Sequence, residues 1–388
     1  MIKYQQYFTE YINSQQISDH EFSFCSNQKP SYFSNIFGLF NLNLVNKLNY
    51  SCDQEECISK KIKENLDTFK SSLVKSKIPL STYKPYLQLL TFSLTALKLV
   101  DKLDSINLEH HILPLIPKSI QNCLSEQNIH LGYPKSGNYA MFMAILLIHA
   151  HEYLNSNQSA KIEEWVDYHI KHINRFGFWG DHSTMSHLQF QNGYHQYEIF
   201  DYLGVKNPKF ETAADAVASL ADSRGRFAPY PGGGGCYDYD AIAIITSCGG
   251  NVISKHRNLL NRTYSSILED QNDDGGFCES KYIRPRTLHN FLLSLKHGFN
   301  AKGIARNERF RQAITLQRPK YNRVIGASHW TTNGYNRGWD ESNLWDSYFR
   351  MSAIARIEIA LNYSSNFEWN FVDYPGIGFH KTSREKSK

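Results

Sequence analysis

Segment 182–198 concentrates histidine and amide side chains, the residue types that transfer protons and bind polar ligands. It reads HSTMSHLQFQNGYHQYE and contains His182, His187, His195 and Glu198. His195 and Glu198 are three residues apart, so on a helix they share one face and could act as an acid–base pair. The alternative interpretation is a set of ordinary hydrogen-bonded histidines.

Two aspartates follow a glycine run in the segment GRFAPYPGGGGCYDYDAIAIITS, residues 225–247. Asp238 and Asp240 stand directly before the apolar AIAII. A carboxyl group can serve as an acid at neutral pH if burial and a second carboxylate hold it protonated, and the two aspartates could do this for each other. Against this, a helix N-terminus favours the ionised form, and Asp238 would also suit the N-cap of the following helix.

Further candidates for substrate contact lie near the C-terminal third of the chain. Arg284 and Arg286 flank a proline just before His289. They could bind a diphosphate or a carboxylate through paired hydrogen bonds, or simply be solvated. Trp330 and Trp339 are expected to line the same substrate-binding site, together with His187.

The elements that position these residues form a repeat. An aromatic residue recurs at intervals of 45–53 residues, at Tyr133, Phe178, Phe227, Phe277 and Trp330. Each follows an amphipathic helix, predicted at 119–127, 160–174, 211–221, 257–269 and 307–316. Each precedes a more apolar helix, predicted at 139–154, 193–203, 238–248, 287–296 and 343–361. A sixth hairpin fits at 55–74 and 83–100, and all have the 3.6-residue period of helices.

Repeated helical hairpins cannot bury their apolar faces alone, so neighbours must stack. We therefore expect an all-α fold, an (α/α)6 toroid of about six hairpins over residues 51–365. Residues 1–50 would be an N-terminal extension packing on the barrel, and 366–388 a C-terminal tail. The site would lie at the end where the inner helices begin.

The turn at 271–277, with the pattern Q-x-x-D-G-G-F, resembles the repeat of terpene cyclases and of protein prenyltransferase β subunits. The resemblance covers roughly residues 55–362 and implies an α/α toroid. In class II terpene cyclases an Asp-x-Asp-Asp sequence caps an apolar inner helix, and its middle aspartate protonates an alkene. By that resemblance Asp240 is the acid, beside Asp238 and Tyr239, although Ala241 replaces the third aspartate.

The prenyltransferase resemblance implies a different role for the same loop. Those subunits bind zinc through an aspartate, a cysteine and a histidine at the starts of successive inner helices. Cys236 and His289 match in type and spacing, but Gly234 stands where the aspartate belongs, and Asp238 would have to replace it. This gives a possible Zn²⁺ site with one open position; a buried cysteine and a hydrogen-bonded histidine are the alternative.

The leading hypothesis is thus an isoprenoid-processing isomerase or lyase, a class II terpene cyclase-like enzyme that protonates a polyprenyl substrate. The high aromatic content, 14%, suits a cavity that stabilises carbocations. A zinc-dependent prenyltransferase-like enzyme is one alternative. A second is an α/α-toroid polysaccharide lyase or glycoside hydrolase acting on a sugar chain, with His187, Asn192, His195 and Tyr239 as candidates. A third is a non-catalytic toroid that binds a peptide or lipid.

The composition of the chain bears on its possible partners and on its cellular compartment. The 388 residues carry a net charge of +5 that is spread along the chain, which does not favour a nucleic-acid partner. No apolar run is long enough to span a membrane, and the seven cysteines are scattered without a CxxC pair, so we expect a reduced, cytoplasmic protein. Segment 31–44 looks amphipathic and aromatic; it could pack outside the barrel, close its mouth or touch a membrane surface.

Overall fold

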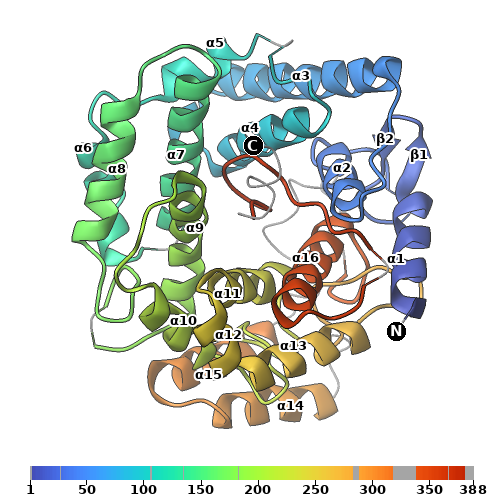
Figure 1. Cartoon of the computed structure of the whole chain (residues 1–388), viewed down its shortest axis with the longest axis vertical. Coiled ribbons are helices and arrows are strands. Elements are labelled where there is room, and N and C mark those ends of the chain that lie inside the picture. Colours follow the sequence, from blue (N-terminus) through green and yellow to red (C-terminus); the bar gives the residue numbers. More distant parts are fainter. Residues whose placement is uncertain are drawn as a thin grey trace. The chain divides into compact units, whose positions relative to one another are not determined.

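The computed structural model describes residues 2–26, 28–104, 107–133, 135–181, 183–282, 288–317, 338–365 and 367–380. These residues form sixteen α-helices, three short 3₁₀ helices and one small antiparallel hairpin (Figure 1). The predicted all-α class is confirmed. No helix among the described residues combines the length and the apolar character that a bilayer crossing requires. The chain divides into two compact units, which are described separately.

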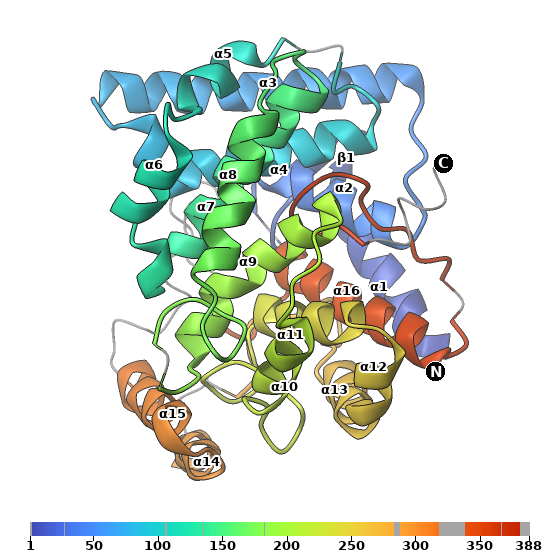
Figure 2. The same cartoon turned by 60° about the vertical axis from the view of Figure 1, so that its left-hand side comes forward.

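Unit 1 comprises residues 1–47, 182–190 and 209–369. Its core is the pair α11 (Gly235–Ser247) and α16 (Leu344–Leu361), which lie side by side in Figures 1 and 2. The other elements are α1 (Ile2–Gln15), β1 (Gln16–Ser18), β2 (Glu21–Phe22), α2 (Ser34–Leu44), α10 (Phe210–Ala218), α12 (Gly250–Lys255), α13 (Arg257–Glu269), α14 (Leu288–Phe299) and α15 (Gly303–Leu316). Helices α2 and α13 pack on α16, and α10 packs on α11.

Unit 2 comprises residues 48–181, 191–208 and 370–388. Its helices are α3 (Cys52–Lys75), α4 (Lys84–Leu99), α5 (Glu109–Ile112), α6 (Ile120–Glu126), α7 (Ser136–Glu152), α8 (Ser159–Lys171) and most of α9 (His187–Leu203), with 3₁₀ turns at Leu80–Thr82, Leu113–Leu115 and Ile129–Leu131. The apolar α7 is buried along most of its length between α4 and the amphipathic α8. The Trp165 indole N–H of α8 donates to the Ala140 carbonyl of α7 at 3.0 Å. The helices predicted at 55–74, 83–100, 139–154 and 160–174 therefore correspond to real helices.

The predicted repeat is visible as one turn that occurs three times. It begins at Asn174, Asp222 and Asn272; in each, the first N–H donates to the carbonyl four residues on, and the N–H three residues on donates back. The residue three positions after the start of each turn is a glycine. Gly177, Gly225 and Gly275 have positive φ angles of 83°, 81° and 87°, a conformation that glycine adopts without strain. The aromatic anchors that follow, Phe178, Phe227 and Phe277, are fully buried. The turns thus fix where the next helix starts.

Three expectations need correction. Tyr133 is 52% exposed, so it is no buried anchor, and Trp330 lies outside the described residues. Segment 31–44 is not an amphipathic extension, because every residue of α2 is buried and α2 packs on α16. The described residues of segment 1–47 therefore belong to unit 1 itself. The tail is not an appendage up to residue 380, since Tyr374 is buried and its hydroxyl lies 2.7 Å from His149 Nδ1.

Candidate active site

The start of α11 differs from the expected one, and this decides the role of Asp238. The helix begins at Gly235 with Gly234 as its N-cap, so Asp238 lies inside the first turn and is not the N-cap. The preceding Gly232 and Gly233 have positive φ. A Cβ on Gly233 would lie 2.8 Å from Asp238 Oδ2. The glycine run is therefore needed to bring the backbone against this carboxylate.

Asp238 is the centre of a buried ionic cluster. Its Oδ2 accepts a hydrogen bond from Arg350 at 2.5 Å and lies 3.2 Å from Arg226 Nε, while Oδ1 accepts the Phe227 N–H at 2.9 Å. Burial raises the pKa of Asp238 to about 7, whereas Arg226 and the Phe227 N–H favour the ionised form. Both oxygens are engaged, so Asp238 acts as a positioning residue and is not placed to give a proton to a substrate.

The two arginines of this cluster hold the glycine loop in place. Arg350 donates to the carbonyls of Gly232, Gly233 and Glu279 at 2.9–3.2 Å. Arg226 donates to the Gly232 carbonyl at 2.6 Å and pairs with Asp270 at 2.8 Å. These contacts connect the loop before α11 to α16 and to the neighbouring repeat turn.

The next two predicted residues lie in the protein interior. Tyr239 is fully buried, with its ring 5.3 Å from that of Phe349 and 5.5 Å from the Arg356 guanidinium. These are packing contacts between α11 and α16. Asp240 is also buried, one residue further along α11.

Several aromatic side chains and one acidic side chain lie near the N-terminal end of α11. Tyr230 donates to Glu279 Oε1 at 2.5 Å, and its ring lies 6.2 Å from Tyr237 and 6.0 Å from Trp339. Cys236 and Tyr237 are partly exposed here. Burial, Cys236 and Glu279 raise the pKa of Tyr237 well above its ordinary value, so its hydroxyl stays protonated. Sequence reasoning named Cys236 and Trp339 but missed Tyr230, Tyr237 and Glu279.

His187 forms a carboxylate–histidine pair with Glu308 of α15. Oε2 of Glu308 accepts the His187 backbone N–H at 2.7 Å and lies 3.0 Å from the ring Nδ1. Facing a carboxylate, Nδ1 carries the ring proton and leaves Nε2 as the basic nitrogen. Nε2 is buried and has no hydrogen-bond partner among the described residues. Burial lowers the pKa of His187 although Glu308 opposes it, so the ring is neutral at pH 7.

The local sequence explains why His187 is held so firmly. Ser186 and Gln189 form a capping box: the Ser186 hydroxyl accepts the Gln189 N–H at 3.1 Å and the Gln189 side chain accepts the Ser186 N–H at 3.0 Å. Helix α9 therefore begins at His187 and not at the predicted residue 193. This S-x-x-Q pattern is a signal that could have placed His187 at a helix start. The partner Glu308, 121 residues away, has no such signal.

A second carboxylate–histidine pair lies within electrostatic reach of the first. His297 Nδ1 of α14 is 3.4 Å from Asp222 Oδ2, and its Nε2 is also buried without a partner among the described residues. Arg309, next to Glu308, donates to the His297 carbonyl at 3.2 Å. Both His297 and Arg309 contribute to the lowered pKa of His187. The charge of Glu308 in turn contributes to the raised pKa of Tyr237. The two carboxylate–histidine pairs and the N-terminal end of α11 therefore lie in one region of unit 1.

His195 and Glu198 belong to the part of α9 that lies in unit 2. His195 Nε2 is 2.5 Å from the Asn138 amide nitrogen of α7, and burial together with Lys84 lowers the pKa of His195 to about 3. Glu198 is buried as well. His195 is thus a buried neutral ring that bonds to α7, which is the alternative interpretation of this pair.

The predicted zinc ligands are not assembled. Cys236 is partly exposed, Asp238 is engaged by two arginines and His289 is exposed on α14. Their ligand atoms do not all lie within 4.8 Å of one another, so these three residues do not form the expected site. Two permanent guanidinium charges already satisfy the carboxylate that would have replaced the missing ligand. Arg284, Arg286 and Trp330 lie outside the described residues, as does His182.

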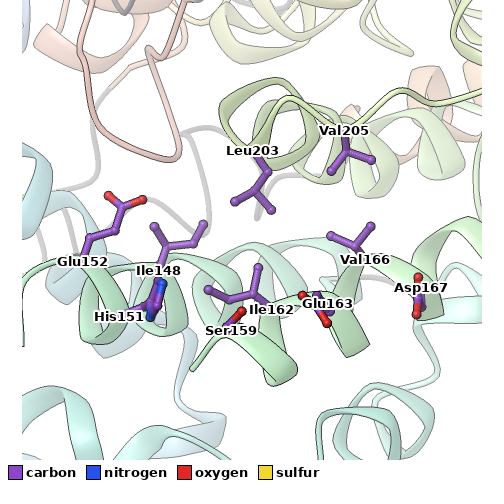
Figure 3. A pocket seen from close by; sticks show the side chains of 10 residues that line it. All are labelled: Ile148, His151, Glu152, Ser159, Ile162, Glu163, Val166, Asp167, Leu203 and Val205. Carbon is purple, nitrogen blue, oxygen red and sulfur yellow. The ribbon is translucent and has the colours of Figure 1, made fainter. Parts of the chain in front are cut away.

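Unit 2 contains a separate surface groove of about 490 Å³ between α7, α8 and the end of α9 (Figure 3). Leu203 and Val205 lie on one side, opposite Ile162 and Val166. The groove also carries acidic side chains, among them Glu152, whose Oε2 accepts the Tyr202 hydroxyl at 2.7 Å. None of the residues predicted to be catalytic lines it.

Comparison of the chain with known protein families, with curated proteins and with solved structures finds no match. The function therefore has to be argued from the site itself.

Proposed function

We propose that the protein is an acid–base enzyme, built on an (α/α)6 toroid, that cleaves an acidic sugar chain by β-elimination. The observation that carries this proposal is the His187–Glu308 pair. A neutral buried imidazole with its Nδ1 proton directed at a carboxylate, and with no partner for Nε2 among the described residues, is the arrangement of a general base. The repeated turn before successive helices supports the toroid.

The neighbouring residues supply the other roles that this reaction needs. His187 Nε2 would take the proton from the carbon next to the uronate carboxylate. The bond from the adjacent carbon to the glycosidic oxygen then breaks, a carbon–carbon double bond forms, and the leaving oxygen takes a proton from the Tyr237 hydroxyl. A tyrosine hydroxyl is protonated at neutral pH, and Tyr237 is a partly exposed residue of the first turn of α11. Arg284 and Arg286 remain the predicted partners of the substrate carboxylate.

The side chains near the N-terminal end of α11 have the chemistry of a sugar-binding surface. Tyr237 is partly exposed and offers an aromatic face for the apolar side of a sugar ring, while the buried ring of Tyr230 packs between it and the buried Trp339. The partly exposed Glu279 offers a carboxylate beside them. Phe190 of α9 packs its ring 6.3 Å from Tyr237. Since Phe190 and His187 are three residues apart on one helix, this contact links the sugar-binding surface to the base.

The test is incubation with a panel of uronate-containing polysaccharides, with ultraviolet absorbance of the new conjugated double bond as the readout. We expect turnover by the wild type and a roughly 10²–10⁴-fold loss in His187→Gln, the usual contribution of a general base. Glu308→Gln should lose part of the rate, and His289→Gln, altered at an exposed position of α14, should lose none. The proposal fails if no uronate polymer is cleaved, or if cleavage survives in His187→Gln.

The isoprenoid cyclase remains a second candidate because Asp240 is buried within α11, the helix that follows the glycine-rich loop. With Asp238 engaged by arginines, Asp240 would be its acid. Cyclisation of a polyprenyl substrate that is lost in Asp240→Asn but kept in His187→Gln would favour this function over β-elimination. The reverse pattern would exclude it.

A further inference from the structure

Two adjacent histidines of unit 2 converge on one carboxylate oxygen. His111 Nε2 lies 3.0 Å and His110 Nε2 lies 3.3 Å from Asp67 Oδ1. The histidines belong to the short helix α5 and the aspartate to the long helix α3, which lie beside each other in Figures 1 and 2. All three potential ligand atoms lie within 4.8 Å of one another. No other group of three or more such residues with this spacing occurs in the described parts of the chain.

We propose that Asp67, His110 and His111 bind a divalent transition-metal ion of the Zn²⁺ type. Two imidazole nitrogens and one carboxylate oxygen are a common ligand set for zinc, and they leave a fourth position for water or an exogenous ligand. Ligand atoms about 2.0–2.1 Å from a tetrahedral ion are about 3.3–3.4 Å apart. The two nitrogen–oxygen distances of 3.0 and 3.3 Å are close to this spacing, and the two imidazole nitrogens lie within 4.8 Å of each other.

The surroundings orient the ligands in the way that metal sites require. Nδ1 of His111 lies 2.7 Å from the buried Tyr86 hydroxyl of α4. If Nδ1 donates to this hydroxyl, Nε2 is left as the ligand, which is the usual arrangement for a metal-binding histidine. Lys70, one turn after Asp67, donates to the His110 carbonyl at 2.7 Å and so holds the backbone of α5.

Access and burial are also suitable. The side chains of His110 and Asp67 are about half exposed, at 50% and 47%, whereas that of His111 is fully buried. An ion can therefore enter from solvent and still have one rigid ligand. Once bound, it would tie α5 to α3.

The experiment is equilibrium dialysis of the full chain against Zn²⁺, with metal content measured per chain, and replacement by Co²⁺, whose visible absorption reports tetrahedral coordination. We expect one ion per chain. His110→Ala and Asp67→Asn remove ligands at half-exposed positions and should abolish the site. Tyr86→Phe removes only the partner of Nδ1 and should weaken affinity about 10–100-fold.

The matched control is His256→Ala. His256 also pairs with an aspartate, with Nε2 2.8 Å from Asp215 Oδ1, but this pair lacks a second histidine. The control should keep full binding. The proposal is overturned if the wild type binds no Zn²⁺ or Co²⁺, if His110→Ala and Asp67→Asn bind as the wild type does, or if His256→Ala loses the ion.

Discussion

Three buried neutral histidines of unit 2 predict that the protein loses stability as the pH falls from 7 to 5. His149, His169 and His195 are each at most 9% exposed. Burial lowers their pKa values to about 4, 3 and 3. Each is held in its neutral form by the fold: Nδ1 of His149 contacts the Tyr374 hydroxyl, and Nδ1 of His169 donates to the Trp165 carbonyl at 2.7 Å.

The direction and the size of this pH-dependent change in stability follow from the linkage between proton binding and folding. A histidine whose folded pKa is depressed contributes stability that is present above its unfolded pKa of about 6.5 and is lost as pH falls towards the folded value. At pH 5 the unfolded ring is almost fully protonated and the folded ring is not, which costs about 2 kcal/mol for each histidine. The three together remove about 6 kcal/mol, a large share of the roughly 5–15 kcal/mol that stabilises a typical protein.

Urea denaturation followed by circular dichroism at pH 8, 7, 6 and 5 measures this directly. We expect these three histidines alone to lower the free energy of unfolding by about 4 kcal/mol per pH unit near pH 5, so the measured fall should be at least this large. His149→Gln should reduce the total loss between pH 8 and 5 by about 2 kcal/mol, and His289→Gln controls for the substitution itself. A free energy of unfolding that is flat from pH 8 to 5, or an unchanged slope in His149→Gln, would refute the reasoning.

Three further predictions concern unit 1 and are checked by urea denaturation at pH 7. Arg350→Met removes one partner from Asp238 and should cost about 3–5 kcal/mol, whereas Lys255→Met, from an exposed pair, should cost at most about 1. Glu358→Ala deprives two tyrosines and a tryptophan of their acceptor and should cost at least about 2 kcal/mol. Gly275→Ala places a Cβ 2.0 Å from a carbonyl oxygen at a φ of 87° and should cost about 1–3 kcal/mol or more, while Gly250→Ala, which meets no atom within 4 Å, should change little. If a variant and its control lost equal free energy of unfolding, or if Glu358→Ala lost none, the stabilising role given to that contact would be wrong.

Local features of the fold could be predicted from the sequence. The helical period and the Gly-aromatic turns located most helices to within a few residues, and α13 at Arg257–Glu269 matches its prediction. These signals are local, because they depend on side chains within one or two helical turns. The amphipathic, aromatic pattern of segment 31–44 did not show that its polar side chains have partners inside the protein. In the structure Asn41 is buried and donates to the Leu344 carbonyl at 3.0 Å, a partner about three hundred residues away.

The chemistry of the site was harder to predict for the same reason. Asp238 was correctly placed at the start of an apolar helix, but its partner Arg350 is 112 residues further on, and no spacing rule pairs them. His187 was named as a substrate-binding residue, while its partner Glu308 was not recognised. A single sequence indicates which residue types are available, but only the packing of the helices decides which of them meet.

The proposed function depends on one property of His187: a neutral ring with its proton on Nδ1 and an Nε2 that no described residue bonds. Nitrogen-15 NMR of labelled protein, with His187→Gln to assign the signal, measures the tautomer and the protonation state directly. We predict the neutral Nδ1–H tautomer at pH 7 and a pKa below the ordinary histidine value of about 6.5, because burial lowers the pKa of this ring. An imidazolium at pH 7, or a proton on Nε2 at pH 7, would contradict the assignment of His187 as the base.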